Sequence, residues 1–310
     1  MKNIELKCYD CYQSAIATVA RFFNHDYQIV ALGRIGFKYD EDMVESIGTK
    51  IHPYEYRKFD DFWELIGISQ HEYILENDSE QIFKEHLKNN QPILLWADLY
   101  DCYWNLAFNK YHFPHCYLLN GYEKNKENVV FSGQDSFFNT QEIKQTFGQI
   151  RRMTSKYNVF EVYKKQYNYY EKIFDEVKKD AEYYFLNESG MNIGRFAEDL
   201  QRVNFEKENK YGTRDLYAVP LIDNLKIVGD RRKAYFVMIK FLSNVCKKNM
   251  YNILEGLNST YKKWELVRII LIKKMMSGEK KLELDLVHKL LNEIIVIEES
   301  IFEEILKNTK

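Results

Sequence analysis

The sequence of 310 residues predicts an α+β fold, with strands in the N-terminal half and a mostly helical C-terminal half. Short apolar runs bounded by turn residues, a pattern typical of strands, occur over 93–100, 115–122 and 128–135. From about residue 158, apolar residues recur every three or four positions, which is the period of an α-helix. We therefore expect two domains, residues 1–157 and residues 158–310.

The first predicted element is a helix that begins at Cys11. Apolar residues recur at helical spacing over 11–23. Asp10 is followed three residues later by Gln13, which is the pattern of a capping box. A cysteine at a helix start meets unpaired backbone N–H groups and the positive end of the helix dipole, and both favour the nucleophilic thiolate. The negative charge of Asp10 opposes this effect, so we expect a neighbouring base to assist.

A predicted hairpin supplies that base. Its two strands flank a polar turn that we centre on Asn125, so that the numbers of paired residues sum to 250. His115 then faces Asp135 on the same side of the sheet, whereas a slip of one residue would place them on opposite faces. A histidine oriented by a carboxylate, beside a helix-capping cysteine, is the arrangement that activates a sulfur nucleophile.

Each of these residues also has a structural interpretation when it is taken alone. A cysteine at a helix start is usually a small buried apolar residue. A histidine that opens a strand is more often structural, and an aspartate that ends one is usually a turn former. The joint spacing of Cys11, His115 and Asp135 favours catalysis over these separate explanations.

The strand that follows Pro92 is almost continuously apolar, which predicts burial on both faces. Asp98 interrupts this pattern and either lines the site or ends the strand. An aromatic loop over 100–108 follows and either walls a channel for an acyl group or packs as a structural anchor. We predict substrate contacts for Asp98, Tyr100 and Trp104.

Helices are expected at several further places along the chain. In the N-terminal half, they are expected over 60–67, ended by Gly67, and over 79–88. In the C-terminal half, we expect a helix over 160–186, a short helix or turn over 220–229, and long helices that start at Arg231, Thr260 and Leu282. Together the C-terminal helices predict a bundle that helps to shape substrate or carrier binding.

Composition and charge exclude several classes of protein. Aromatic residues make up 15% of the chain and there are only 4 prolines, which excludes a disordered chain. The net charge of −2 argues against a dedicated nucleic-acid binder. Residues 1–150 hold 14 Lys and Arg against 22 Asp and Glu, and residues 151–310 hold 30 against 24. The basic half either attracts an acidic partner or is an ordinary solvated helical surface.

The five cysteines do not indicate a disulfide framework, because their number is odd and the N-terminus lacks the apolar core of a signal peptide. We expect a cytoplasmic protein without a membrane segment, since no apolar run approaches the length of a membrane span. A zinc site is an alternative: Cys8 and Cys11 form one closely spaced pair, which Cys102, His112 or Cys116 would have to complete. No second such pair exists, so we expect no metal.

The same residues resemble the family of the N-terminal domain of butirosin biosynthesis protein H. The resemblance is carried by Asp10-Cys-Tyr-Gln-Ser-Ala-Ile-Ala17, by Pro92-Ile-Leu-Leu-Trp-Ala-Asp-Leu-Tyr100, by His115-Cys-Tyr-Leu-Leu-Asn-Gly-Tyr122 and by Asp135. It covers roughly residues 1–155. It implies a papain-like, cysteine-protease-type N-terminal domain with Cys11 as nucleophile, His115 as base and Asp135 as orienting acid.

The resemblance also implies an activity. Characterised members of that family act as acyltransferases that move an acyl group from a carrier-protein thioester to an amine, in antibiotic and peptide-like natural-product pathways. The expected partners are therefore an acyl or peptidyl carrier protein, whose phosphopantetheine arm presents the substrate, and a small amine acceptor. No separate cofactor is expected. The alternatives are a cysteine peptidase or amidase that uses the same triad, and a non-catalytic binding module.

One position departs from the papain-like pattern. Papain-like proteases place a glutamine six residues before the cysteine as an oxyanion donor, and here that position holds Glu5, which cannot donate a hydrogen bond when ionised. Gln13 is near Cys11, but capping is its expected role. A missing donor would cost about 3–4 kcal/mol of transition-state stabilisation, which an activated thioester tolerates better than an amide.

Overall fold

The computed structural model describes residues 1, 7–40, 46–53, 57, 59–125, 128–138, 140–165, 167–210, 219–277 and 284–308. The chain divides into two compact units, Met1–Val30 with Phe62–Tyr167, and Ala31–Asp61 with Asn168–Lys310. This division differs from the expected domains 1–157 and 158–310 in two ways. The first unit continues beyond residue 157, and a segment from the N-terminal half belongs to the second unit.

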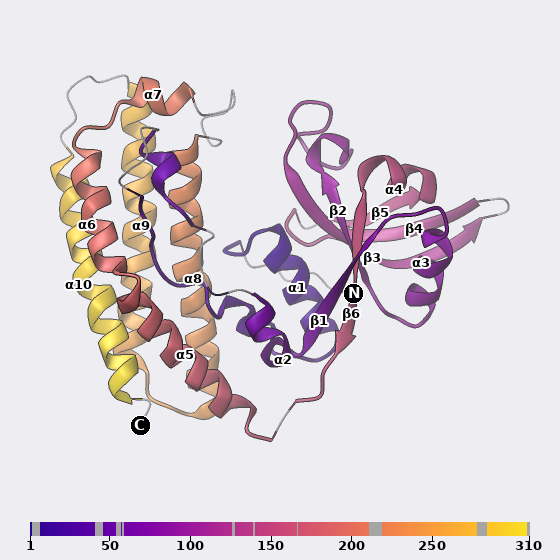
Figure 1. Ribbon diagram of the computed structural model, residues 1–310, viewed down its shortest axis with the longest axis horizontal. Helices are drawn as coiled ribbons and strands as arrows, with labels where there is room; N and C mark the ends of the chain where they lie inside the picture. Colours follow the sequence, from indigo (N-terminus) through magenta and orange to yellow (C-terminus); the bar gives the residue numbers. More distant parts are fainter. Residues whose placement is uncertain are drawn as a thin grey trace. The chain divides into compact units, whose positions relative to one another are not determined.

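Within the described residues, the first unit is built on a six-stranded antiparallel sheet (Figure 1). The strand order is β1-β6-β2-β3-β4-β5. The strands are β1 Ile68–Ile74, β2 Ile93–Asp98, β3 Pro114–Asn125, β4 Asn128–Asp135, β5 Thr140–Thr146 and β6 Lys156–Val162. The predicted strand after Pro92 and the predicted β3–β4 hairpin are confirmed, whereas β1 and β5 were not predicted.

Helices border this sheet. They are α1 Cys11–Phe22, α2 Trp63–Ile66, α3 Ser79–Lys88 and α4 Phe147–Met153. Short 3-10 helices cover Tyr27–Ala31, Phe59–Phe62 and Leu99–Asp101. The predicted end of a helix at Gly67 is confirmed, because that glycine caps α2 with a φ of 86°, a left-handed conformation that favours glycine.

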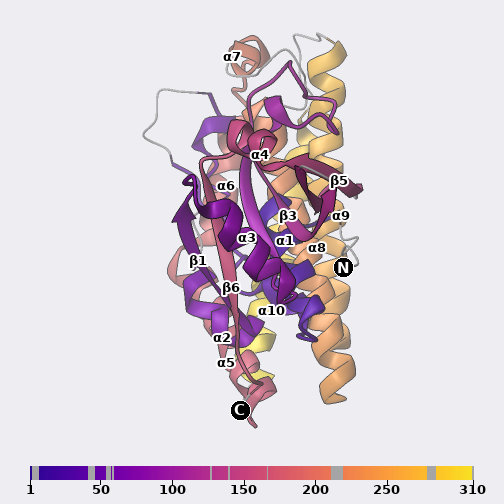
Figure 2. The same ribbon diagram turned by 90° about the vertical axis from the view of Figure 1, so that its right-hand side faces the viewer.

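The sheet has apolar side chains on both faces of β2, as its continuous apolar run predicts. Leu95 of β2 packs in one core with Tyr117 of β3 and Phe83 of α3. Helix α3 contacts β2 and β3 (Figure 2). Leu94 and Leu118 are also fully buried, and because side chains alternate along a strand they belong to the opposite face. Helix α1 packs against β3, so the helix that begins at Cys11 and the strand that holds His115 are in direct contact.

The helix predicted over 160–186 is wrong at its start. Residues Lys156–Val162 form β6, and helix α5 begins only at Tyr169. Strand β6 pairs with both β1 and β2, and four of its consecutive residues are buried. A short apolar run of this kind fits the period of either a strand or a helix, and the pairing partners on each side decide for a strand.

The second unit contains the helices of the C-terminal region (Figure 1). They are α5 Tyr169–Leu186, α6 Ser189–Leu200, α7 Phe205–Lys210, α8 Pro220–Cys246, α9 Tyr251–Ser277 and α10 Asp285–Asn308, together with a 3-10 helix at Gly48–Lys50. Helix α10 contacts α5, α6 and α9, and α9 also contacts α8. This arrangement confirms the prediction of a mostly helical C-terminal region.

Two of the predicted helix starts are wrong. Helix α8 runs without a break through Gly229, where a break was expected. Gly229 lies inside α8 against α9, where an added Cβ would meet the Cβ of Trp264 at 3.5 Å, an ordinary packing distance, so this glycine does not end the helix. Thr260 is buried inside α9, and its hydroxyl donates to the carbonyl of Leu257 at 3.1 Å. The predicted start at Leu282 lies outside the described residues.

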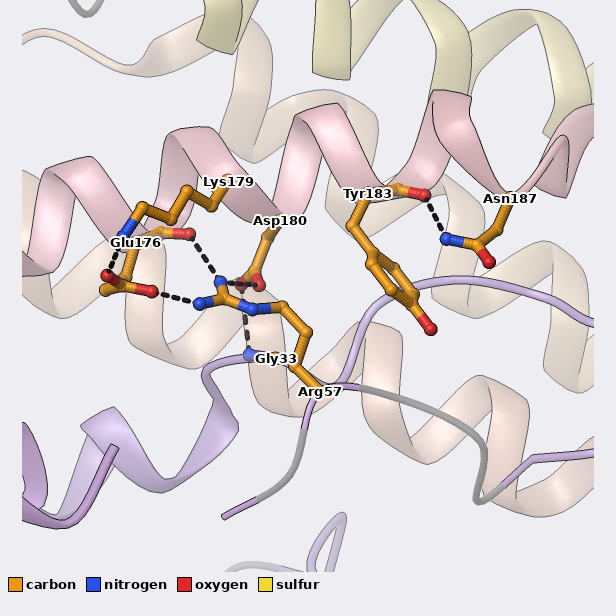
Figure 3. A network of polar contacts seen from close by, with 7 residues as sticks. All are labelled: Gly33, Arg57, Glu176, Lys179, Asp180, Tyr183 and Asn187. Atoms are coloured by element: carbon orange, nitrogen blue, oxygen red, sulfur yellow. Dashed lines mark hydrogen bonds and ion pairs between the residues drawn. The ribbon is translucent and has the colours of Figure 1, made fainter. Parts of the chain in front are cut away.

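The segment 31–61 is tied to α5 by a buried ionic network (Figure 3). Arg57 forms ion pairs with Glu176 and Asp180, with an N···O distance of 3.1 Å to Asp180. The backbone N–H of Gly33 donates to the other oxygen of Asp180 at 3.1 Å. Burial raises the pKa of Asp180 to about 6, although Gly33 and Arg57 both lower it. The network explains why this segment belongs to the helical unit.

None of the described helices combines the length and the apolar character that crossing a membrane requires.

Candidate active site

Cys11 occupies the first turn of α1, where the predicted capping box is confirmed. Asp10 Oδ1 accepts a hydrogen bond from the N–H of Gln13 at 2.7 Å, and Gln13 Oε1 accepts one from the N–H of Asp10 at 3.3 Å. The thiol of Cys11 is partly exposed. The N–H of Cys11, as the first residue of the helix, has no acceptor within the helix and can donate to a bound group.

The register of the β3–β4 hairpin differs from the predicted one. The prediction made paired residue numbers sum to 250. Near the turn the sum is 253, as for Gly121 opposite Ser132, and farther away it is 252, as for Leu118 opposite Gln134. The change occurs at a β-bulge at Asn120, where β3 has one residue more than β4.

This bulge decides which face the acid occupies. If the register near the turn had continued, Asp135 would stand opposite Leu118, on the other face from His115. Beyond the bulge the paired numbers sum to 252, and extending that register places Asp135 opposite Tyr117, which shares a face with His115. The predicted register was wrong by two residues, and an even error leaves both side chains on one face.

The predicted contact between His115 and Asp135 is confirmed. His115 Nε2 lies 2.8 Å from Asp135 Oδ2, and the two side chains are 2% and 0% exposed. Trp104 Nε1 donates to the same oxygen at 2.9 Å, and the N–H groups of Phe137 and Phe138 donate to Oδ1 at 3.1 and 3.2 Å. Four groups therefore fix the carboxylate. Asp135 Oδ2 accepts a hydrogen bond from Nε2, so Nδ1 is the ring nitrogen that remains for Cys11.

Trp104 lies at the carboxylate of Asp135. Its indole N–H donates to Asp135 and its ring packs edge to face on Tyr117 at 5.0 Å, and its contact with substrate stays a prediction. Trp104 therefore holds the acid that orients the histidine. The loop over 100–108 thus contributes to the site through the hydrogen bond from Trp104 to the carboxylate of Asp135.

The surroundings of Cys11 stabilise its thiolate. A hydrogen bond from the Cys116 thiol lowers the pKa of Cys11 most, burial raises it, and His115 lowers it further; the result is a pKa of about 6. Asp10 raises it slightly, as expected. Burial and the proximity of Cys11 raise the pKa of Cys116 well above its usual value, so Cys116 stays a protonated donor. No catalytic role was predicted for Cys116 from the sequence. Its position directly after His115 is the only feature that could have indicated one.

The imidazole of His115 is correspondingly basic. Burial lowers its pKa, but the hydrogen bonds to Asp135 and Cys11 outweigh burial and raise the pKa to about 9. Between pH 6 and pH 9, Cys11 and His115 therefore exist as a thiolate–imidazolium pair. This is the form in which a cysteine attacks a carbonyl carbon and a histidine can protonate the leaving group.

Asp98 and Tyr100 organise the loop that begins at the end of β2. Asp98 accepts hydrogen bonds from His112 Nδ1 at 2.8 Å and from the N–H groups of Tyr100 and Phe113 at 2.9 and 3.0 Å. The rings of Tyr100 and His112 stack at 4.2 Å. Burial raises the pKa of Asp98, but the hydrogen bonds from Tyr100, His112 and Phe113 together outweigh it, so the pKa is lowered. In the described part of the chain, no hydrogen bond or ring contact joins Asp98 or Tyr100 to Cys11 or His115.

Two further features concern oxyanion binding and metals. Glu5 lies outside the described residues. The N–H of Cys11 is one donor that the described site offers to an oxyanion. The amide nitrogen of Gln13 is buried and makes no hydrogen bond within the described segments. Among the described residues, no three His, Cys, Asp or Glu side chains are grouped so that they could hold a metal ion.

Comparison with known proteins adds no assignment. No protein-family model matches the chain, and no curated protein sequence matches it either. The chemistry of the site is therefore inferred from the positions of its own residues.

Proposed function

We propose that the protein is a papain-like cysteine acyltransferase that forms amide bonds through a Cys11 acyl-enzyme. The observation that carries this proposal is the grouping of Cys11, His115 and Asp135, with the pKa of Cys11 lowered to about 6 and that of His115 raised to about 9. A structural cysteine needs no such environment. The resemblance of segments 10–17, 92–100 and 115–122 to the butirosin protein H family supports the same activity.

The reaction would proceed in two steps. The Cys11 thiolate adds to the thioester carbonyl, a carbon–sulfur bond forms, and the leaving thiol takes the proton of the His115 imidazolium. Neutral His115 then accepts a proton from the attacking amine, and the amide product leaves as Cys11 is released as a thiolate. Asp135 keeps the imidazole oriented in both steps. No cofactor is required.

A thioester fits the site better than an amide. The N–H of Cys11 is one oxyanion donor, and a missing second donor costs about 3–4 kcal/mol. A thioester is already activated and tolerates that loss. We therefore propose an acyl or peptidyl carrier protein as donor, a small amine as acceptor, and a cytoplasmic setting. The excess of Lys and Arg in residues 151–310 supports an acidic carrier as partner.

The test is single-turnover acylation. The wild-type protein is mixed with simple acyl thioesters, the mass of the intact protein is followed, and a panel of amines is then added. The proposal expects an acyl adduct on Cys11 that amines convert to amides, and no adduct in Cys11→Ala. Cys246→Ala is the matched control, since its thiol is partly exposed but has a raised pKa. Hydrolysis that outruns aminolysis with every amine would instead indicate an amidase or thioesterase.

A further inference from the structure

Two exposed phenylalanine rings stand beside the imidazole of His115. Phe137 and Phe138 are 41% and 40% exposed, and their rings meet edge to face at 4.9 Å. The ring of Phe138 lies 5.3 Å from the His115 ring, and that of Phe137 lies 6.3 Å from it. The two rings shield the histidine on one side and still present apolar surface to solvent.

The backbone of this pair is held at the site by Asp135. Both backbone N–H groups donate to Asp135 Oδ1, at 3.1 Å from Phe137 and 3.2 Å from Phe138. The other oxygen of Asp135 binds His115 and Trp104. One carboxylate therefore binds both the catalytic base and the backbone from which the two rings extend, which places the rings beside the base.

We infer that Phe137 and Phe138 form the acyl subsite, and that the preferred donor carries an apolar acyl group, either an aliphatic chain of four or more carbons or an aryl group. This inference rests on the proposed function. Rings that served only to shield His115 would gain from burial, whereas rings that receive substrate must stay partly open before it binds.

The acyl group is a better occupant than the amine or the carrier arm. Once bonded to Cys11, the acyl chain remains beside His115 through both steps, while the carrier thiol leaves after the first. The amine must reach His115 in its neutral form, and a face that favoured its cationic form would oppose attack. An apolar chain on the rings also displaces water, which suppresses hydrolysis of the acyl-enzyme.

The step tested is acylation alone. The Cys11 thiolate attacks the carbonyl carbon, the new bond to Cys11 Sγ forms as the bond to the donor sulfur breaks, and the donor thiol leaves with the proton of His115. Acetyl, butyryl and hexanoyl thioesters of N-acetylcysteamine share one leaving group and differ only in chain length. The rate constant kacyl/K for Cys11 is measured with each by intact-protein mass spectrometry.

If the methylenes of the acyl chain are buried against the two rings, kacyl/K should rise about threefold for each methylene added. Phe138→Gln, which keeps side-chain bulk but is polar, should lose most of this rise, and Phe138→Leu should keep most of it. Phe22→Gln is the matched control, because Phe22 is 38% exposed and its ring meets that of Phe23 edge to face at 5.0 Å. It should leave the dependence on chain length unchanged.

The pH profile of Cys11 alkylation separates a lost subsite from a damaged triad. A Phe138→Gln protein with the wild-type profile and a flat chain-length response supports the inference. Rapid acylation that is independent of chain length in the wild type overturns the inference and leaves the proposed function standing. Failure of every thioester to acylate Cys11 overturns both. A chain-length response that survives Phe138→Gln and Phe137→Gln overturns the assignment to these rings.

Discussion

At the residue scale, Cys11 differs from the other cysteines in its surroundings. Burial raises the pKa of Cys102 to about 12, and burial also raises that of Cys246. The pKa of Cys11, by contrast, is lowered, because Cys116 and His115 both stabilise its charged form. Charge-assisted hydrogen bonds of this kind are about twice as strong as neutral ones.

Replacing Cys116 tests the least expected of these contacts. Cys116→Ala removes the donor and should raise the pKa of Cys11 by about one unit, since a hydrogen bond to a charged group contributes about 1.5–3 kcal/mol and solvent replaces part of it. The measurement is the pH dependence of iodoacetamide labelling at Cys11. Cys102→Ala removes a comparably buried thiol and should leave the midpoint unchanged. An unchanged midpoint in Cys116→Ala would contradict the assignment.

Replacing His115 should slow the alkylation of Cys11 at acidic pH. The wild-type Cys11 thiolate forms as the pH rises through about 6, so limiting iodoacetamide at pH 6 should label Cys11 selectively. In His115→Ala, the pKa of Cys11 should rise and the labelling rate at pH 6 should fall by about fivefold or more, as expected for a shift of at least one pKa unit from a value of about 6. Peptide mapping gives the rate at each cysteine. Slow labelling spread over several cysteines, equal in both proteins, would indicate a structural Cys11.

The same pair of pKa values sets the pH range of acylation. Activity should fall below about pH 6, where Cys11 takes up a proton, and above about pH 9, where His115 loses the proton that the leaving thiol needs. Acylation rates measured from pH 4.5 to pH 10.5 with one thioester should therefore form a bell. A rate that keeps rising through pH 9 would show that the neutral histidine is the active form.

At the element scale, the start of α1 and the bulge of β3 position the two reacting groups. The capping box determines where α1 begins and therefore places Cys11 at its N-terminus. The bulge at Asn120 determines which face of the sheet Asp135 shares. The bulge is packed closely, since a Cβ at Gly133 would lie 2.9 Å from the carbonyl oxygen of Leu118.

Two substitutions of Asp10 separate its role as the cap of α1 from the effect of its negative charge on Cys11. Asp10→Asn keeps a capping oxygen and should change the free energy of unfolding by only a few tenths of a kcal/mol, while the pKa of Cys11 falls because a negative neighbour is gone. Asp10→Ala loses the cap and should cost about 1 kcal/mol. Urea unfolding and the labelling profile measure the two effects. Thr146→Ala removes the equivalent cap from α4 and should cost a similar amount without moving the Cys11 midpoint.

At the scale of the whole molecule, the chain is divided between a sheet-based unit and a helical unit that share one continuous sequence. The segment 31–61 belongs to the helical unit, although it lies between α1 and the strands in the sequence. The ion pairs of Arg57 with Glu176 and Asp180 connect this segment to α5. Asp180 is fully buried, so its protonation state affects the stability of the unit.

The pKa of Asp180 predicts a specific pH dependence of stability. A folded-state pKa of about 6 lies above the unfolded value, so the folded state binds more protons and loses stability as the pH rises from about 4 to about 6. Asp180→Asn removes this titration, and the stability of the wild type relative to it should fall by about 3 kcal/mol across that window. Urea unfolding at several pH values measures the difference. Asp175→Asn, an exposed position on the same helix, should show no such change.

Much of the fold and part of the site are encoded locally. The helix start at Cys11, the hairpin that follows residue 114, the buried strand after Pro92 and the mostly helical C-terminal region follow from capping pattern and apolar period. Each depends on interactions within a few residues or on a period that repeats. Strand β6 and the uninterrupted helix α8 did not follow from the local sequence. Strand β6 forms where β1 and β2 pair with it, and α8 packs along α9 on both sides of Gly229.

The sequence by itself determined which residues carry the candidate chemistry: Cys11 at a helix start, and His115 and Asp135 on a hairpin. Only the tertiary structure decided how they meet. The bulge at Asn120 sets the face, and neither the Cys116 thiol beside Cys11 nor the indole of Trp104 on Asp135 has a signal in the local sequence. The physical reason is that a pKa and an orientation depend on neighbours brought together by packing, which local propensity and period do not specify.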